Sequence, residues 1–273
     1  MGILKTITDE YFGETVRKED EIDIEGIDVE IVSFTDNNKK YHKKGYKPKD
    51  KDNLKKLLRR MIEVRGDEGD FNDIDTSDIK DMSLLFYKRD GFNGDITSWD
   101  VSNVEDMNHM FLGAKSFNQP IGNWDVSNVK NMRCMFLGTT FNQPIGDWNV
   151  SSVKDMGAMF DDTPLFNQPI GNWNVSNVEY MNSMFSSATS FNQPIGDWDV
   201  SSVKDMYGMF ERAAAFNQPI GEWDVTNVKD MDSMFYSAKS FNQDLSKWNL
   251  DGKNISYIFD NCPIKDEYKP KMN

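Results

Sequence analysis

All seven tryptophans of this chain fall at the same place in a repeating pattern. Successive tryptophans are 25 residues apart, with a single step of 24, at Trp99, Trp124, Trp148, Trp173, Trp198, Trp223 and Trp248. A fixed period of this length is typical of repeat proteins, whose units stack because none of them can bury its apolar face alone. The sequence therefore predicts a solenoid, and it directs the search for function to a surface rather than to a catalytic pocket.

One repeat reads W-[DN]-V-[ST]-[NS]-V-x-x-M-x-x-M-F-x-x-A-x-x-F-N-Q-P-I-G-x. Twelve of the 16 methionines and sixteen of the 18 phenylalanines occupy its Met and Phe positions. A methionine stripe can form an adaptable binding surface, but these methionines are interleaved with Phe and Val in every unit. We therefore expect one continuous core, in which burial of each large apolar side chain contributes roughly 1.5–3 kcal/mol.

The period is too short for a repeat of two helices, which needs about 33 residues. The spacing Met-x-x-Met-Phe places three apolar groups on one side of a helical turn. The Phe-Asn-Gln-Pro-Ile segment is expected to be extended, because a residue before proline avoids the α region, and the following Gly turns the chain. These features predict leucine-rich-repeat-like α+β coils, with short strands and one short helical turn per 25 residues. The Asn of Phe-Asn-Gln is expected to form an internal ladder.

The pattern divides the chain into four parts. Residues 67–262 form the solenoid of about eight coils, with degenerate units at both ends, and residues 263–273 form a polar tail. Residues 50–66 hold an amphipathic helix from Asp52 to Val64, with Asp50 or Asp52 as N-cap. Residues 1–49 are a β-rich cap or extension, in which Glu21 to Phe34 is expected to form a hairpin turning near Gly26 or Asp28. Helix and hairpin together predict an N-terminal α+β cap over the first coil.

The net charge of −14 is unevenly distributed. Residues 67–273 carry 16 basic and 31 acidic side chains, which argues against a solenoid that wraps nucleic acid. Residues 39–65 carry 12 basic and 3 acidic side chains, the densest being Lys39, Lys40, Lys43, Lys44, Arg59 and Arg60. This segment is compatible with nucleic acid or anionic lipid. We favour a solvated face beside acidic parts of the same chain.

Sequence motifs for catalysis, a metal or a cofactor are missing. The two histidines, His42 and His109, lie in different regions, and no phosphate-binding or zinc-binding spacing occurs. Cys134 and Cys262 lie five coils apart, too far for a disulfide. An acidic column invites a calcium hypothesis, but Asn149 and its equivalents share that column, and Asx turns explain the mixture. Its acids are Asp100, Asp125, Asp199 and Asp224. We expect a non-enzyme without metal or cofactor.

The repeat resembles the BspA-like leucine-rich-repeat surface proteins, including the mycoplasma-type repeat of unknown function in that group. The resemblance covers residues 50–262 and rests on the long motif quoted above, repeated in register. It implies a solenoid related to the treponemal class of leucine-rich repeat, and a role in adhesion or protein–protein recognition at the cell surface or after secretion. The chain departs from the family in having neither a signal peptide nor a membrane-spanning segment, which favours the cytoplasm instead.

Two variable columns indicate where a protein ligand would bind. The residues that flank the second Met of each unit change freely along the chain, and on a helical turn they would share the face opposite the core. Solvent exposure alone explains most of this variation. Tyrosine and arginine, however, are enriched at interaction hot spots, and here they gather in adjacent coils. The predicted protein-binding residues are Tyr180, Tyr207, Glu211, Arg212, Asp232 and Tyr236.

Two functions of different classes are compatible with these sequence features. The first is a non-enzymatic, acidic, bacterial-type protein-binding module that acts in adhesion or recognition. The alternative is an intracellular inhibitory or immunity-type protein that covers a basic effector. Export to the cell surface would favour adhesion, whereas retention beside an effector would favour inhibition.

Overall fold

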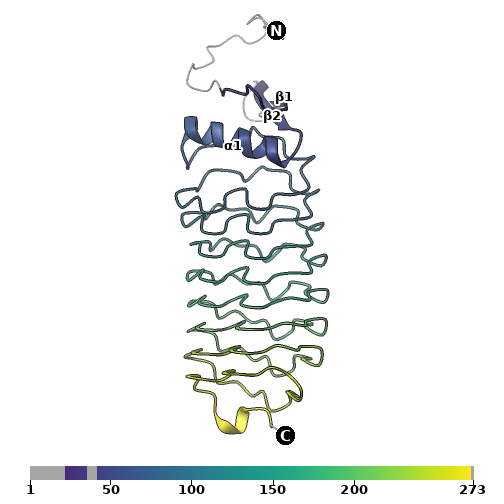
Figure 1. The fold of residues 1–273 in the computed structure, drawn as a ribbon, viewed down its shortest axis with the longest axis vertical. Helices are drawn as coiled ribbons and strands as arrows, with labels where there is room; N and C mark the ends of the chain where they lie inside the picture. Colours follow the sequence, from purple (N-terminus) through teal and green to yellow (C-terminus); the bar gives the residue numbers. More distant parts are fainter. Residues whose placement is uncertain (1–21, 36–41, 272–273) are drawn as a thin grey trace, which may run out of the picture.

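The computed structural model describes residues 22–35 and 42–271. The chain runs as a stack of coils beneath a hairpin and a helix (Figure 1). Strands β1 (Val29–Thr35) and β2 (His42–Pro48) pair antiparallel, and helix α1 (Lys51–Arg65) lies between them and the first coil. The 3-10 helix η2 (Asp266–Tyr268) lies at the opposite end of the stack.

A ladder of backbone hydrogen bonds joins each coil to the next. In the coil of Met181, alternate residues donate their N–H groups to the following coil, at N···O distances of 2.7–3.0 Å. Met181, Ser183, Phe185 and Ser187 donate to the carbonyls of Asp205, Tyr207, Met209 and Glu211. The same four positions donate in every coil from Met82 to Met231, so each coil lies in register on its neighbour.

The segment Met-x-x-Met-Phe forms a pair of tight turns in place of the helical turn expected from its spacing. The N–H of Met184 returns to the carbonyl of Met181, and Ser183 and Ser187 have φ values of 55° and 54°. A helix would direct these N–H groups back along its own axis. Left-handed φ instead lets Ser183 and Ser187 donate to the next coil. This costs each non-glycine residue about 1 kcal/mol or more, which the inter-coil hydrogen bonds offset.

Methionine, phenylalanine and tryptophan fill the interior of the stack, as expected. Met181, Met184 and Phe185 are fully buried. The ring of Phe185 lies 3.9 Å from that of Phe191 in its own coil, and 5.7 and 5.8 Å from the equivalent rings of the neighbouring coils. The methionine stripe is therefore core rather than a binding surface.

Asparagine side chains form a ladder along the coil corners. The N–H of Asn167 donates to Oδ1 of Asn142 at 3.0 Å, and the N–H of Asn192 donates to Oδ1 of Asn167 at the same distance. The amide of Gln193 also donates to the backbone carbonyl of Asn167. The expected ladder is therefore present, but it lies at the partly exposed edge of the coils and not in the interior.

Glycine is required where the coils approach most closely. A Cβ atom on Gly196 would lie 2.4 Å from the carbonyl oxygen of Pro219 in the next coil, and one on Gly171 would lie 2.5 Å from that of Pro194. Both obstacles are backbone atoms, which a side-chain rotation cannot remove. The Gly after Pro-Ile therefore sets the distance between coils at this corner, in addition to turning the chain.

Helix α1 closes the first coil. Oδ1 of Asp50 accepts the N–H of Asn53 at 2.9 Å, so Asp50 is the N-cap and the helix ends at Gly66. One face of the helix is buried against the first coil, through Leu54, Leu57, Leu58, Met61 and Ile62. At its end, both terminal nitrogens of Arg65 donate to the Asp73 carboxylate at 2.7 Å.

The N-terminal hairpin lies later in the sequence than expected. Gly26, with φ 73°, does turn the chain, but in the described part, which begins at Ile22, the residues before it form no strand pair with those after it. Instead β1 pairs with β2. The sequence of β2 does not resemble a strand, because three of its residues are lysines. Tyr46 of β2 then forms a parallel bridge to Ile74, so the hairpin extends the backbone ladder above the first coil. The prediction of a hairpin within Glu21–Phe34 is wrong, although Glu21 itself lies outside the described residues.

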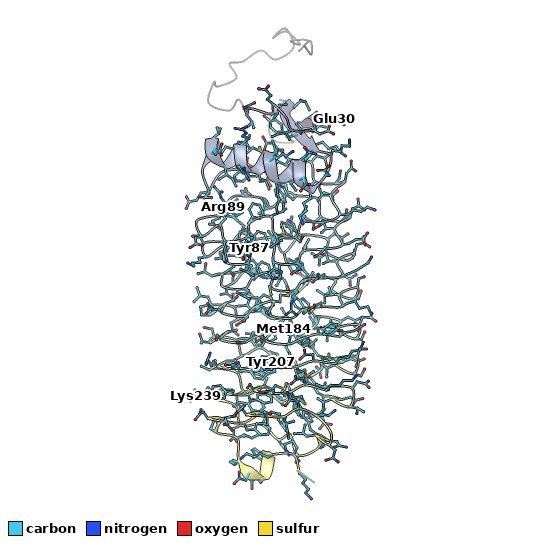
Figure 2. The ribbon with its side chains drawn as sticks, in the orientation of Figure 1. Glu30, Tyr87, Arg89, Met184, Tyr207 and Lys239 are labelled. Atoms are coloured by element: carbon cyan, nitrogen blue, oxygen red, sulfur yellow. The ribbon has the colours of Figure 1, made fainter. Side chains whose placement is uncertain are left out.

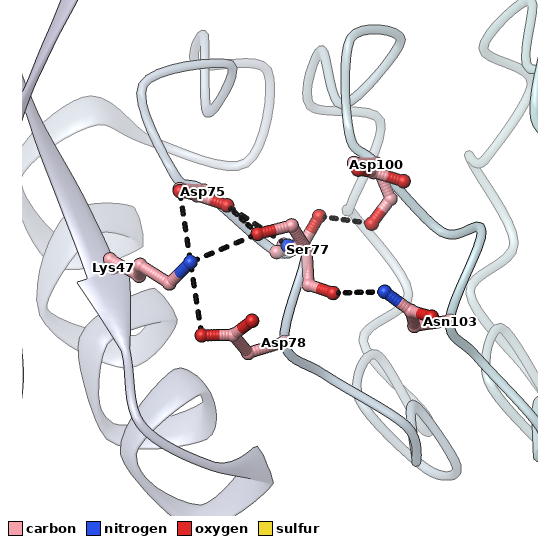
Figure 3. Close-up of polar contacts among 7 residues, drawn as sticks. Lys47, Asp75, Ser77, Asp78, Asp100 and Asn103 are labelled. Carbon is pink, nitrogen blue, oxygen red and sulfur yellow. Dashed lines mark hydrogen bonds and ion pairs between the residues drawn. The ribbon is translucent and has the colours of Figure 1, made fainter.

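The described part of the basic segment forms ion pairs within the chain. Nζ of Lys47 lies 2.9 Å from the Asp78 carboxylate and 3.5 Å from that of Asp75, both in the first coil (Figure 3). The amide of Asn103 continues this polar network by donating to the Ser77 carbonyl from the second coil. These contacts support the interpretation of the basic residues as partners of acidic coils. Lys39 and Lys40 lie outside the described residues.

The other end of the stack is closed by the tail. The N–H of Leu245 donates to the carbonyl of Tyr268, and the N–H of Lys265 donates to Oδ1 of Asn242. Ile264 is buried against the last coil. Within residues 22–35 and 42–271, no helix has the length and hydropathy needed to cross a bilayer.

Candidate functional site

The tight turns of the ladder present two variable side chains per coil. In the coil of Met206 these are Tyr207 and Glu211, whereas the intervening Met209 and Phe210 point into the core and are fully buried. The Tyr207 side chain is 42% exposed and lies in the C-terminal half of the stack (Figure 2). The two variable columns therefore share one outer face, although turns rather than a helix bring them together.

This face has a shallow, open hollow where three consecutive coils place tyrosines. The hollow has a volume of about 330 Å³, and we call it the tyrosine hollow. It is lined by Tyr207, Glu211, Arg212, Ser233, Tyr236 and Tyr257. Tyr257 is 63% exposed, while the Glu211 side chain is only 19% exposed. The hollow thus combines aromatic walls with one largely shielded carboxylate.

Arg212 lies along the wall of the tyrosine hollow. Its guanidinium carbon is 5.9 Å from the centre of the Tyr236 ring, and its Nη1 is 3.4 Å from the Glu211 carboxylate. The first distance is just within the range of a cation–π contact, which extends to about 6 Å. The Arg212 side chain is nevertheless 62% exposed, so it is held only loosely.

A second hollow, of about 510 Å³, lies along the Pro-Ile-Gly corner of the last coils. Its walls repeat the consensus residues, such as Pro194 and Pro219, and Lys247 forms an ion pair with Glu222 across it. Because most coils carry the same Pro-Ile-Gly residues at this corner, the hollow has little side-chain diversity with which to select a ligand. The tyrosine hollow is the better candidate site.

Three overlapping segments, residues 53–173, 124–218 and 159–269, match the family described as Mycoplasma protein of unknown function, DUF285. The chain belongs to this family. The matched residues span helix α1, the coils and the tyrosine hollow, and they leave the hairpin outside. No curated protein and no solved structure matches the chain. The expected mycoplasma-type repeat is thereby confirmed.

Four of the six predicted binding residues of this DUF285 chain meet in the tyrosine hollow, namely Tyr207, Glu211, Arg212 and Tyr236. Tyr180 does not. It occupies the bridge position before the first Met, where it pairs with Asp155 and Asp205, and its side chain is 40% exposed. Asp232 lies beside the hollow, and its carboxylate accepts the Ser233 hydroxyl at 2.6 Å.

Two residues that line the tyrosine hollow were not predicted from the sequence. Ser233 and Tyr257 belong to the column immediately before the second Met, whereas the predicted residues come from the columns that follow it or lie further away. The signal was present, because most coils place a smaller residue than tyrosine there, such as Ala158, Ser183 or Gly208. A tyrosine in this column of the last coil is therefore an outlier among the repeats of this chain.

The acidic column of the repeat forms Asx turns. Oδ1 of Asp199 accepts the N–H of Ser201 at 3.0 Å, and Oδ1 of Asn174 accepts that of Ser176 at 3.2 Å. Asp and Asn thus accept the same backbone hydrogen bond through Oδ1, so their alternation in this column needs no bound cation. In the parts of the chain that the structure describes, no three His, Cys, Asp or Glu residues are placed to hold a metal ion. Both cysteines are free, and burial raises the pKa of the Cys134 thiol to about 11.

Asp161 makes stability depend on pH. Burial raises the pKa of its carboxyl to about 6, and the nearby carboxylates of Asp162 and Glu211 act in the same direction. The folded state therefore binds this proton more tightly than the unfolded chain, whose aspartate pKa is about 3.9. Protonated Asp161 therefore stabilises the folded state relative to ionised Asp161. This contribution is fully present below about pH 4 and is lost as the pH rises through about 6.

We predict that Asp161→Asn will be more stable than the wild type at pH 7, with the difference shrinking towards pH 4. Urea midpoints measured across this range check the prediction. Asp100→Asn is the matched control, because asparagine already occupies that column in other coils. An equal response of both variants at every pH would contradict the assignment to Asp161.

Proposed function

We propose that this chain is a non-enzymatic protein-recognition module, a BspA-like leucine-rich-repeat solenoid that acts in adhesion or protein–protein recognition. The observation that carries the proposal is the tyrosine hollow. It places three tyrosines and one arginine, residue types enriched at binding hot spots, on one face of a stack whose remaining aromatic residues are mostly buried.

The backbone ladder supports this proposal because it makes the face rigid. Tyr207 and Tyr236 stand on turns whose carbonyls accept N–H groups from the preceding coil at 2.7 and 2.8 Å. Side chains presented on such a fixed backbone lose less conformational entropy when a partner binds. The stacked, in-register coils likewise support the proposed leucine-rich-repeat class.

The acidity of the coils favours a second candidate of a different class, an inhibitory or immunity-type partner of a basic effector. Residues 67–273 carry 31 acidic and 16 basic side chains, a balance that attracts basic proteins and accelerates their association. Fractionation of the native cell distinguishes the two. Export supports adhesion, and retention beside a basic effector supports inhibition.

We predict that the double variant Tyr207→Ala, Tyr236→Ala will fail to capture the partner that the wild-type chain retains from native cell extract. Loss of a hot spot costs about 2 kcal/mol or more, so the affinity for the purified partner should fall at least about 30-fold in a binding titration. The melting curve should stay nearly unchanged, because neither side chain belongs to the buried core.

The matched control is Tyr87→Ala with Tyr180→Ala. These tyrosines are 43% and 40% exposed, close to the 42% of Tyr207, but they lie outside the hollow. The control variant should bind like the wild type. Wild-type affinity in the Tyr207, Tyr236 variant would overturn the proposal.

A further inference from the structure

The tyrosine hollow has the composition of a site for a positively charged side chain. Tyr207, Tyr236 and Tyr257 come from three successive coils, and their aromatic faces attract cations through the ring quadrupole. Glu211 adds a carboxylate whose side chain is only 19% exposed, so its charge is screened less than that of a fully exposed acid. Ser233 is the small residue among them and leaves the space between the rings open.

The chain itself places a cation in this hollow. The Arg212 guanidinium lies 5.9 Å from the Tyr236 ring centre and 3.4 Å from the Glu211 carboxylate. It therefore makes the two contacts that a cationic ligand would seek. Because the Arg212 side chain is 62% exposed, solvent screens its pairing and the contact is weak. A ligand can displace it at little cost.

The surroundings of the hollow attract cations and repel anions. Asp232 lies beside Ser233, and its carboxylate accepts the Ser233 hydroxyl. Two coils before Glu211, the Asp161 carboxyl feels enough burial and neighbouring negative charge to raise its pKa to about 6. An anionic ligand would have to approach through this field, and Arg212 is the basic residue among those that line the hollow.

We propose that the tyrosine hollow binds the lysine or arginine side chain of a basic segment in the partner protein, with the Glu211 carboxylate as counter-ion. This inference rests on the proposed recognition function and names the chemistry of the ligand. Tyr257, exposed at 63% in the last coil, forms the outer wall of the site. Arg212 acts as an intramolecular competitor that leaves when the ligand enters.

The test uses the full chain and three fluorescent, end-blocked peptides in which glycine alternates with arginine, lysine or glutamate. Fluorescence anisotropy at low and at high salt separates site binding from general attraction to an acidic surface, which salt screens. The arginine and lysine peptides should bind, and a measurable part of this binding should persist at high salt. The glutamate peptide should not bind.

Four variants locate the binding. Tyr257→Ala removes a cation–π contact and Glu211→Gln removes an ion pair. Each variant should bind the arginine peptide about 5-fold more weakly, which corresponds to about 1 kcal/mol. Arg212→Ala should bind the peptide more tightly than the wild type, because it removes the competitor. Tyr180→Ala is the matched control, with a tyrosine of similar exposure outside the hollow, and it should be unchanged.

Two outcomes would overturn the inference. If Tyr257→Ala and Tyr180→Ala bind the arginine peptide equally well, the basic peptide senses only the general negative charge. If Arg212→Ala abolishes binding and the glutamate peptide binds the wild type, the ligand is anionic. Either outcome leaves the recognition function standing, provided that the Tyr207, Tyr236 double variant still loses the native partner.

Discussion

Replacing Phe185 with alanine is expected to lower the free energy of unfolding by about 3–5 kcal/mol, the usual cost of removing a large aromatic side chain from a core. Phe185 is fully buried in the middle of the stack. Its ring packs on Phe191 in its own coil, and on Phe160 and Phe210 in the coils on either side. The cavity would therefore open against three coils at once, and urea denaturation followed by tryptophan fluorescence would measure the loss.

The same substitution at Phe259 should cost less. This residue stands in the same column of the last coil, it is only partly buried, and it stacks on Phe235 at 5.8 Å from one side. Stability in stacked repeats is a sum of terms within units and between neighbours, so a terminal position contributes fewer of them. Equal losses at Phe185 and Phe259 would contradict a continuous core with weaker ends.

Replacing Arg65 with alanine is expected to destabilise the N-terminal end by about 3–5 kcal/mol, because it leaves a buried carboxylate without its partner. The Asp73 side chain is 2% exposed and receives two hydrogen bonds of 2.7 Å from Arg65. This pair ties the end of α1 to the first coil. Hydrogen exchange should show α1 and the first coil opening before the middle of the stack.

Arg89→Ala provides the comparison for this prediction. Arg89 pairs with Asp67 at 2.5 Å, but both side chains are about 40% exposed, so its loss should cost no more than about 1 kcal/mol. In the double variant Arg65→Met, Asp73→Asn, no buried charge is left unpaired, and it should recover much of the loss. If Arg65→Ala and Arg89→Ala prove equally mild, the Arg65–Asp73 pair does not anchor the helix.

The repeat period was sufficient to predict which side chains are buried. Each coil places its Met, Phe and Trp residues at equivalent positions. Residues one repeat apart in the sequence therefore stack directly on one another in the core. The helix was predicted almost to its ends, because its apolar face and the Asp50 cap are local signals. The conformation of the Met-x-x-Met turns was not predicted. Residues as different as Leu84, Lys88 and Cys134 adopt left-handed φ there, so no residue type signals it. Hydrogen bonds to the next coil, rather than local preference, determine that conformation.

The candidate site was predicted in part for a similar reason. Tyr207 and Tyr236 were identified because they vary in columns whose outward direction follows from the core pattern. Tyr180 was grouped with them by residue type, although its bridge position holds it outside the hollow. Tyr257 was missed because the last coil replaces both methionines with isoleucine and was treated as a cap. Whether a terminal unit covers the stack or extends its binding face depends on three-dimensional contacts.

The direction of the backbone ladder bears on how such a chain changes length. Every coil from Met82 to Met231 donates the same four hydrogen bonds towards the C-terminus. Along this ladder an interior coil therefore donates to the coil after it and accepts from the coil before it, in the same way wherever it stands in the stack. Duplication or deletion of one 25-residue unit leaves each remaining junction intact, and the helix and the tail stay on their own end coils. The number of coils can therefore change without altering the contacts between the coils that remain. The reach of the stack can be adjusted in whole steps, while a single new coil can bring new side chains to the outer face without disturbing the fold.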